Sequence, residues 1–241
     1  MIKFLRRVII AVLLGVFAFS AYNLYIIFSE YKANKDVYND ISEIVIKEDK
    51  EVEIKNEEYN RLKEINKDYL FWINIPGTNV NYPVVKSQDN EDYLYTNFNG
   101  EENKGGSLFV DSRNNLENDH NMIIHGHNMQ DKSMFGTLSN LLKSEYFNEN
   151  KKIYIYLENK ILEYEIFSVY VNELDFDPYV TTFNTDEEFN EYISNVMKKS
   201  YHNLEYIDDS EKNIITLSTC TNATGDERTI VHAKLVSEKD I

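Results

Sequence analysis

The 241-residue sequence contains a single cysteine, three prolines and eight glycines. One cysteine excludes an intramolecular disulfide and any metal site built from several thiolates. So few prolines and glycines exclude collagen-like and proline-rich chains. Basic residues are also scarce, since 25 lysines and arginines against 41 acids give a net charge of −16. Because nucleic-acid binding depends on a basic surface, we expect no nucleic-acid partner.

Large side chains that can be buried are, in contrast, plentiful. Apolar residues make up 42% and aromatic residues 13% of the chain, which is too many for an intrinsically disordered protein. The length corresponds to one or two domains of about 150 residues each. Residues 1–28 contain Lys3, Arg6 and Arg7 and no acid, so all the acids belong to the remainder. We therefore predict an acidic globular body preceded by a small basic end.

Residues 8–28 form an uncharged, largely apolar run directly after Arg7. At about 1.5 Å per residue, such a helix spans the roughly 30 Å hydrocarbon core of a membrane. A buried helix and a cleaved signal peptide are the alternatives, but the run continues beyond its one weak cleavage site at residues 18–20. Because basic residues stay on the cytoplasmic side, we predict a single-pass protein of the cell membrane. Residues 1–7 form its cytoplasmic tail, residues 8–28 its anchor, and the body lies outside the cell.

Residues 29–66 are rich in Glu, Lys, Asn and Tyr, and they contain no proline or glycine. Ile41, Ile44 and Val45 recur at helical spacing, which predicts one or two helices with a break near residues 48–51. A solvated, charged stalk is the alternative.

Residues 67–241 are predicted to form the folded domain, because from residue 69 short β-like runs alternate with turn residues. The predicted strands are 71–75, 80–85, 107–110, 122–125, 153–157, 162–171, 213–219 and 228–236. Pro83 indicates an edge position or a strand end for the second run. About eight short strands with few helices favour a mainly β fold, closed or nearly closed into a barrel.

Two helices are predicted within this domain. The clearer one covers residues 186–200, because acids occupy its first turn and Lys198 and Lys199 its last, as the helix dipole favours. Its apolar residues form a single stripe, composed of Phe189, Tyr192, Ile193, Val196 and Met197. The second, shorter helix is predicted at residues 134–142.

The lone cysteine, Cys220, ends the strand 213–219. Because side chains alternate along a strand, Cys220 shares a face with Thr216 and Ser218, and this face is more polar than the other. A buried, inert thiol remains the alternative for a lone cysteine. Arg228 opens the next strand, so antiparallel pairing would bring Arg228 and Cys220 to the same end of a hairpin. An ordinary surface charge is the alternative for Arg228.

A cysteine nucleophile needs an acid or base that the fold brings near it. His125 and His127 flank Gly126 at the end of an apolar strand, whereas the other three histidines have no such setting. The pair is also compatible with a metal site. No acidic or cysteine ligand pattern accompanies it, however, so we expect no metal.

Together these residues resemble the signature motifs of sortases. The matching segments are 216–220 with Arg228 and residues 230–235, then 124–129, and the early segments 71–75, 81–84, 90–94 and 106–111. The resemblance covers about residues 69–236. The N-terminal helices and the helix before the cysteine strand resemble class B. This resemblance implies an eight-stranded sortase-type β-barrel with N-terminal helices.

The resemblance implies a membrane-anchored cysteine transpeptidase of Gram-positive bacteria. Such an enzyme cuts the C-terminal sorting signal of a secreted protein after a threonine, and then joins the protein to a peptidoglycan amine. Class B implies a signal of the Asn-Pro-x-Thr type or a related x-Pro-x-Thr type. Two alternatives are a sortase of another class that joins pilin subunits and a membrane-tethered binding domain without turnover.

The resemblance also assigns roles to residues. It makes Cys220 the nucleophile, and it gives the acid–base role to His127 rather than His125. Arg228 is implied to contact the substrate backbone or the developing oxyanion. The implied lining of the substrate groove is Asn90, Leu94, Tyr179 and Ser218. No cofactor is implied.

Overall fold

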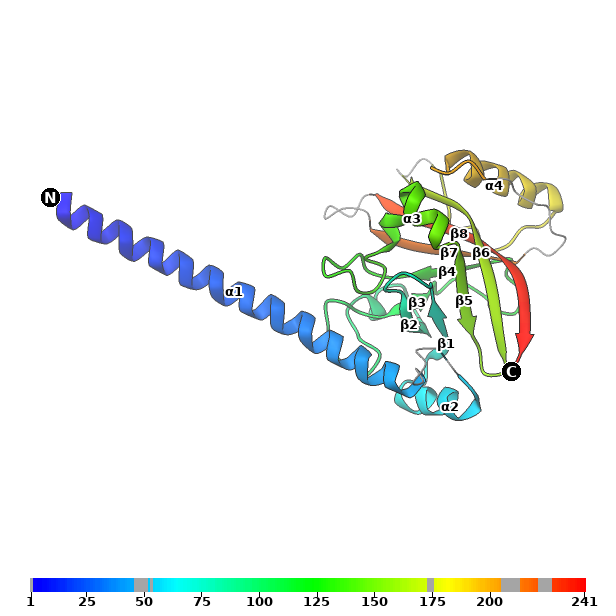
Figure 1. Ribbon diagram of the computed structural model, residues 1–241, viewed down its shortest axis with the longest axis horizontal. Helices are drawn as coiled ribbons and strands as arrows, with labels where there is room; N and C mark the ends of the chain where they lie inside the picture. The colour runs from blue at the N-terminus through cyan, green and yellow to red at the C-terminus, as the bar shows by residue number, and fades with distance from the viewer. Residues whose placement is uncertain (1, 46–51, 53, 173–175, 205–212, 221–226) are drawn as a thin grey trace.

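The computed structural model describes residues 2–45, 52, 54–172, 176–204, 213–220 and 227–241 (Figure 1). Eight strands form a closed barrel in the order β1-β2-β3-β4-β7-β8-β6-β5, and the pairing of β5 with β1 closes it. The strands are β1 Tyr69–Asn74, β2 Asn81–Lys86, β3 Leu108–Val110, β4 Asn121–His125, β5 Lys152–Tyr156, β6 Lys160–Asn172, β7 Ile214–Cys220 and β8 Arg228–Asp240. Only β2–β3 and β4–β7 are parallel among these neighbouring pairs. The predicted mainly β barrel is confirmed.

Pro83 does not mark an edge strand, because β2 lies between β1 and β3. Pro83 is in register with Trp72 of β1, whereas the parallel pairing with β3 begins only at Val84. Pro83 therefore lies just before the segment of β2 that pairs on both sides. A residue without an N–H fits there, because the ladder on the β3 side has not yet begun.

Apolar side chains from every wall fill the interior of the barrel. The interior residues of the two C-terminal strands include Ile215 and Leu217 of β7 and Val231 and Ala233 of β8, all fully buried. These residues alternate with polar ones along each strand, as expected for a sheet with one face on the core. Because of this alternation, the polar residues of these strands face the outside of the barrel, where the candidate site lies.

Helix α4 (Asp186–Lys199) covers the outer face of the barrel beside β6 and β8 (Figure 1). It begins where predicted, because the side chain of Thr185 accepts a hydrogen bond from the backbone N–H of Glu188. Its apolar stripe packs against Phe167, Tyr170, Ile214 and Ile230. The more polar face of β7 is consequently buried as well, which the alternation of residues alone did not predict.

Helix α1 (Ile2–Val45) runs without interruption from the apolar N-terminal segment to the barrel, and α2 (Asn56–Ile65) follows (Figure 1). The predicted break near residues 48–51 lies outside the described residues. Asn34, Tyr38, Ile41 and Val45 are the buried residues of α1. Among the described residues, α1 alone is long and apolar enough to cross a membrane, and its most apolar stretch is not buried.

The prediction of a helix over residues 134–142 is only partly right. Residues Leu138–Leu142 form a 3-10 helix (η2), and α3 (Ser144–Glu149) follows it. Met134 instead forms a β-bridge with Asn128, and its φ of 51° lies in the left-handed region. A right-handed helix cannot start at such a residue. A second 3-10 helix, η1 (Asp92–Leu94), precedes β3.

Candidate active site

The carboxyl ends of β4 and β7 lie side by side, because the two strands are parallel and His125 is in register with Ser218. Two residues beyond Ser218, β7 ends at Cys220, whose backbone pairs with Arg228 at the start of β8. His127 follows two residues after the end of β4. The fold therefore gathers three strand ends, and the predicted catalytic residues with them, at one edge of the barrel. The side chain of Cys220 lies outside the described part of the structure.

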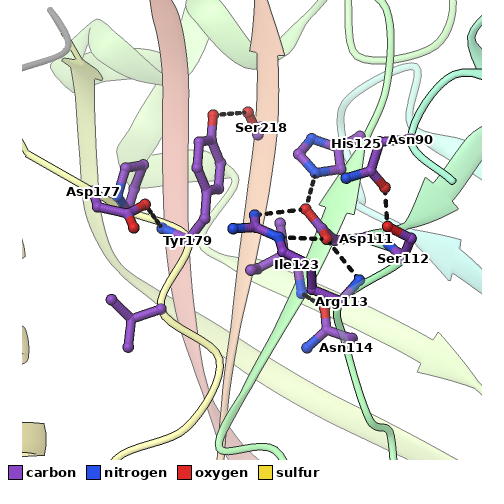
Figure 2. Close-up of polar contacts among 12 residues, drawn as sticks. Asn90, Asp111, Ser112, Arg113, Asn114, Ile123, His125, Asp177, Tyr179 and Ser218 are labelled. Atoms are coloured by element: carbon purple, nitrogen blue, oxygen red, sulfur yellow. Dashed lines mark hydrogen bonds and ion pairs between the residues drawn. The ribbon is translucent and has the colours of Figure 1, made fainter.

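A cleft of about 460 Å³ opens at this edge. Its lining consists of Asn90, Leu94, Tyr95, Phe109, Asp111, Arg113, His125, Gly126, His127, Tyr179, Ser218, Thr219 and Arg228. All the predicted site residues whose side chains are described belong to this lining. The side-chain oxygen of Asn90 accepts the backbone N–H of Ser112 at 2.8 Å, which ties two of the wall segments together (Figure 2).

His127 is half-buried, and its Nε2 lies 2.8 Å from the backbone oxygen of Leu94. A carbonyl oxygen only accepts hydrogen bonds, so Nε2 carries a proton. In the neutral ring Nδ1 is then the basic atom. Leu94 thus does more than line the groove, because its backbone selects the tautomer of His127. The ring of Tyr95 flanks the imidazole, with 6.0 Å between the ring centres.

His125 has a different partner from His127. Its Nε2 donates to Oδ2 of Asp111 at 2.9 Å, and Arg113 binds the same carboxylate through Nε and Nη2, each at 2.9 Å (Figure 2). Burial alone would raise the pKa of Asp111, but the hydrogen bonds from Arg113 and His125 hold it well below its usual range. The carboxylate is therefore ionised, and the three side chains form a fixed cluster in the cleft wall.

The partners of His125 and His127 can be compared with the alternative that these two histidines form a metal site. Each of them already has a protein partner, a carboxylate for His125 and a carbonyl for His127. Among the described residues, no group of three or more His, Cys, Asp or Glu side chains is arranged to hold a metal ion.

Asp111 and Arg113 were not singled out from the sequence as site residues. A weak signal was available, because Asp111 directly follows a short apolar strand. What decides their position is the antiparallel pairing of β3 with β4, which puts Phe109 opposite His125 and leaves Asp111 on the diagonal.

Tyr179 forms the facing wall of the cleft (Figure 2). Its hydroxyl lies 2.8 Å from Oγ of Ser218, and its ring centre lies 5.9 Å from the guanidinium carbon of Arg113. Burial raises the pKa of Tyr179, while the Ser218 hydrogen bond and the positive charge of Arg228 oppose this rise. Tyr179 is therefore neutral at physiological pH, with an apolar ring and a polar tip at the cleft.

A buried hydrogen-bonded chain supports this wall from behind. Oγ1 of Thr216 donates to Oδ1 of Asn121 at 2.8 Å, and the Asn121 amide donates to the carbonyl of Val180 at 2.8 Å. Since the single hydroxyl proton of Thr216 is used, Nδ1 of His232 donates to Thr216 at 2.9 Å, and its Nε2 accepts from Tyr170 at 3.1 Å. Burial lowers the pKa of His232 to about 3, so this histidine is neutral. These hydrogen bonds link the segment next to Tyr179 to four strands of the barrel, β4, β7, β8 and β6.

Comparison with known proteins gives a consistent result. Residues 73–236 match the sortase domain family. A protein of Listeria monocytogenes named Sortase B is 33% identical over 242 residues, covering 98% of each chain. The crystal structure of sortase B from Bacillus anthracis in complex with AAEK1 has a TM-score of 0.77 and 34% identity, covering 87% of this chain and 99% of that one. A Staphylococcus aureus sortase B–substrate complex has a TM-score of 0.78 and 30% identity, with the same coverage.

Proposed function

The chain belongs to the sortase family, as a cysteine transpeptidase of class B, and we propose that Cys220, His127 and Arg228 carry its reaction. One observation carries this assignment. The backbone of Cys220 pairs with that of Arg228, and His127 and Arg228 line the same cleft, beside the end of β4 and the start of β8. No other cysteine exists in the sequence.

The first half-reaction begins with the thiolate of Cys220. It attacks the carbonyl carbon of the threonine in the sorting signal, and the carbonyl electrons move to oxygen. A free thiol, with a pKa of about 8.5, is only slightly ionised at neutral pH. Neighbouring positive charge on Arg228 and on a protonated His127 raises the thiolate fraction. Collapse of the intermediate breaks the peptide bond, and His127 gives its proton to the departing amine.

The second half-reaction resolves the thioester on Cys220. The accepting amine attacks the acyl carbon, His127 takes the proton that the amine loses, and the thiolate leaves. Because Nε2 of His127 donates to Leu94, we assign both proton transfers to Nδ1. Water in place of the amine would give hydrolysis by the same steps.

Arg228 is assigned to the oxygen of the reacting carbonyl or to the substrate backbone. Its guanidinium presents a planar fork of donors that stays charged at every working pH. Such a donor stabilises the charge that develops in the transition state. We assign the substrate groove to Asn90, Leu94, Tyr179 and Ser218, which supply one apolar side chain, one ring and two polar groups.

Sortases act on sorting-signal substrates and on amine nucleophiles. For this chain we propose a signal of the x-Pro-x-Thr type, since the fixed φ of proline pre-bends the peptide and lowers the cost of ordering it. The proposed acceptor is an amine of a peptidoglycan precursor. We further propose that residues 8–28 of α1 cross the membrane, with Lys3, Arg6 and Arg7 inside and the barrel outside.

The test is capture of the acyl-enzyme. The chain is mixed with a sorting-signal peptide, without an added amine, and intact mass spectrometry follows the protein. We expect one acyl adduct on Cys220, none in Cys220→Ala, and release of a transpeptidation product when a peptidoglycan-type amine is added. Turnover that survives in Cys220→Ala would refute the mechanism.

A further inference from the structure

Helix α1 contacts the turn formed by residues 103–107 through side chains on one of its faces. Glu30, Asn34 and Tyr38 recur every four residues, so they share a face of the helix. Glu30 pairs with Lys104 at 2.8 Å. The Asn34 side chain packs closely on the turn, and it would have to shift if Gly105 carried a side-chain carbon. The helix that carries the apolar segment is thus attached directly to a loop of the barrel.

The third contact is made by the hydroxyl of Tyr38, which is buried. It lies 2.8 Å from the carbonyl oxygen of Gly106 and 3.1 Å from Oγ of Ser107. Oγ of Ser107 donates its proton to the carbonyl of Thr96 at 2.9 Å. The single proton of Tyr38 therefore goes to the carbonyl of Gly106, with Oγ of Ser107 as a second, longer acceptor of the same proton. Burial raises the pKa of Tyr38, which keeps this donor neutral. Its ring meets that of Tyr82 edge-on, with 5.2 Å between centres.

The same turn packs against Tyr93 and Leu94, and the carbonyl of Leu94 is the hydrogen-bond partner of His127. Gly106 has a φ of 56°, and a side-chain carbon there would overlap the carbonyl oxygens of Tyr93 and Leu94. The N–H of Ser107 donates to the carbonyl of Tyr93 at 2.9 Å. The next carbonyl, that of Leu94, is the acceptor for Nε2 of His127 at 2.8 Å. A short series of close contacts therefore joins α1 to His127.

We propose that Tyr38 is a positioning residue for His127, so that α1 forms part of the active-site framework. The inference rests on the proposed function, in which Nδ1 of His127 exchanges protons. The Leu94 carbonyl keeps Nε2 protonated only while it stays in line with the ring. Loss of the Tyr38 hydroxyl frees the Gly106 turn, and with it the carbonyl that selects the tautomer.

The experiment compares Tyr38→Phe with Tyr59→Phe in the full chain in detergent micelles. Tyr59 is a matched control, because it lies on α2 and packs on Tyr69 with 5.1 Å between ring centres, away from the turn. Peptide cleavage gives kcat and KM, and ¹⁵N NMR of labelled histidines reports the tautomer of His127, assigned with His127→Gln. Thermal unfolding shows that each variant is folded.

We expect Tyr38→Phe to lower kcat about 5- to 10-fold, the effect of one lost hydrogen bond, with KM nearly unchanged. The His127 signal should change from the Nε2–H form to a mixture of tautomers, and Tyr59→Phe should match the wild type in both respects. Ser107→Ala removes one acceptor of Tyr38 and keeps the ring packing, so it should show the same changes to a smaller degree. It serves as the test variant if Tyr38→Phe does not fold.

An unchanged kcat with an unchanged tautomer would overturn the proposal. So would a loss of activity accompanied by a lower Tm and an unchanged tautomer, because that result describes a purely structural residue. Full activity in His127→Ala would instead refute the proposed function. In that case the tautomer change in Tyr38→Phe would still establish the coupling between α1 and His127.

Discussion

Acid should destabilise this protein through His232, which is fully buried in β8 and hydrogen-bonded to Thr216 and Tyr170. Burial lowers the pKa of His232 to about 3 in the folded chain, whereas an unfolded histidine titrates near a pKa of about 6.5. Between these two values the unfolded state binds a proton that the folded state does not. Stability is therefore lost as the pH falls from about 6.5 towards 3.

The expected magnitude follows from linkage. One proton of difference changes the free energy of unfolding by about 1.4 kcal/mol per pH unit, so acidification from pH 6.5 to 5.0 costs about 2 kcal/mol. That is a large share of the 5–15 kcal/mol typical of natural proteins, to order of magnitude. Asp111 affects stability at a lower pH than His232 does. Its depressed pKa makes a contribution that is present above about pH 4, the pKa of an unfolded aspartate, and lost only below it.

The assay is urea unfolding of the full chain in detergent micelles between pH 7 and 5, followed by the fluorescence of Trp72. This is the single tryptophan of the chain, and it is fully buried in β1. His232→Gln removes the titrating group, so its stability should depend on pH less steeply than that of the wild type, by a difference that approaches about 1.4 kcal/mol per pH unit below pH 6. Thr216→Val is the control. It weakens the network but leaves His232 buried, so it should be less stable at every pH and keep the wild-type slope. Equal slopes for His232→Gln and the wild type would refute the reasoning.

Three further predictions concern the cleft and the anchor. His127→Ala should lose about 10²-fold or more in peptide cleavage, the range of an acid–base group, and His125→Ala should lose less. The reverse ranking would assign the acid–base role to His125. Arg228→Lys should also lose about 10²-fold, as for a lost oxyanion donor, while Cys220 alkylation by a small reagent changes far less. Near-normal cleavage by Arg228→Lys would reduce Arg228 to a background charge. A chain that begins at residue 29 should be soluble and active, because it keeps Tyr38 and every cleft residue, and a folded but inactive product would contradict this division.

Much of the architecture could be predicted from local patterns. Alternating apolar residues located the strands, and the stripe from Phe189 to Met197 located α4, because these periodicities reflect one buried face. The pairing of Cys220 with Arg228 was also predictable, since a short loop between antiparallel strands leaves few registers. The assignment to His127 came from the resemblance of its motif and not from periodicity.

Other features were decided only in three dimensions. The parallel pairing of β4 with β7 places His125 beside Ser218, although 93 positions separate them in the chain. Asp111 can be buried as a carboxylate because Arg113 and His125 both reach it, and only the register of β3 with β4 brings His125 there. Even the polar face of β7 is buried, because α4 covers it.

The sequence by itself therefore determined the strands, the apolar N-terminal run and the identity of the only possible thiol nucleophile. The tertiary structure decided which backbone carbonyl holds His127 and which residue of α1 supports that carbonyl. Tyr38 meets Gly106 across 68 positions of the chain. A contact of this kind has no local signal, because a hydroxyl and a carbonyl satisfy each other only after the helix and the barrel have packed together.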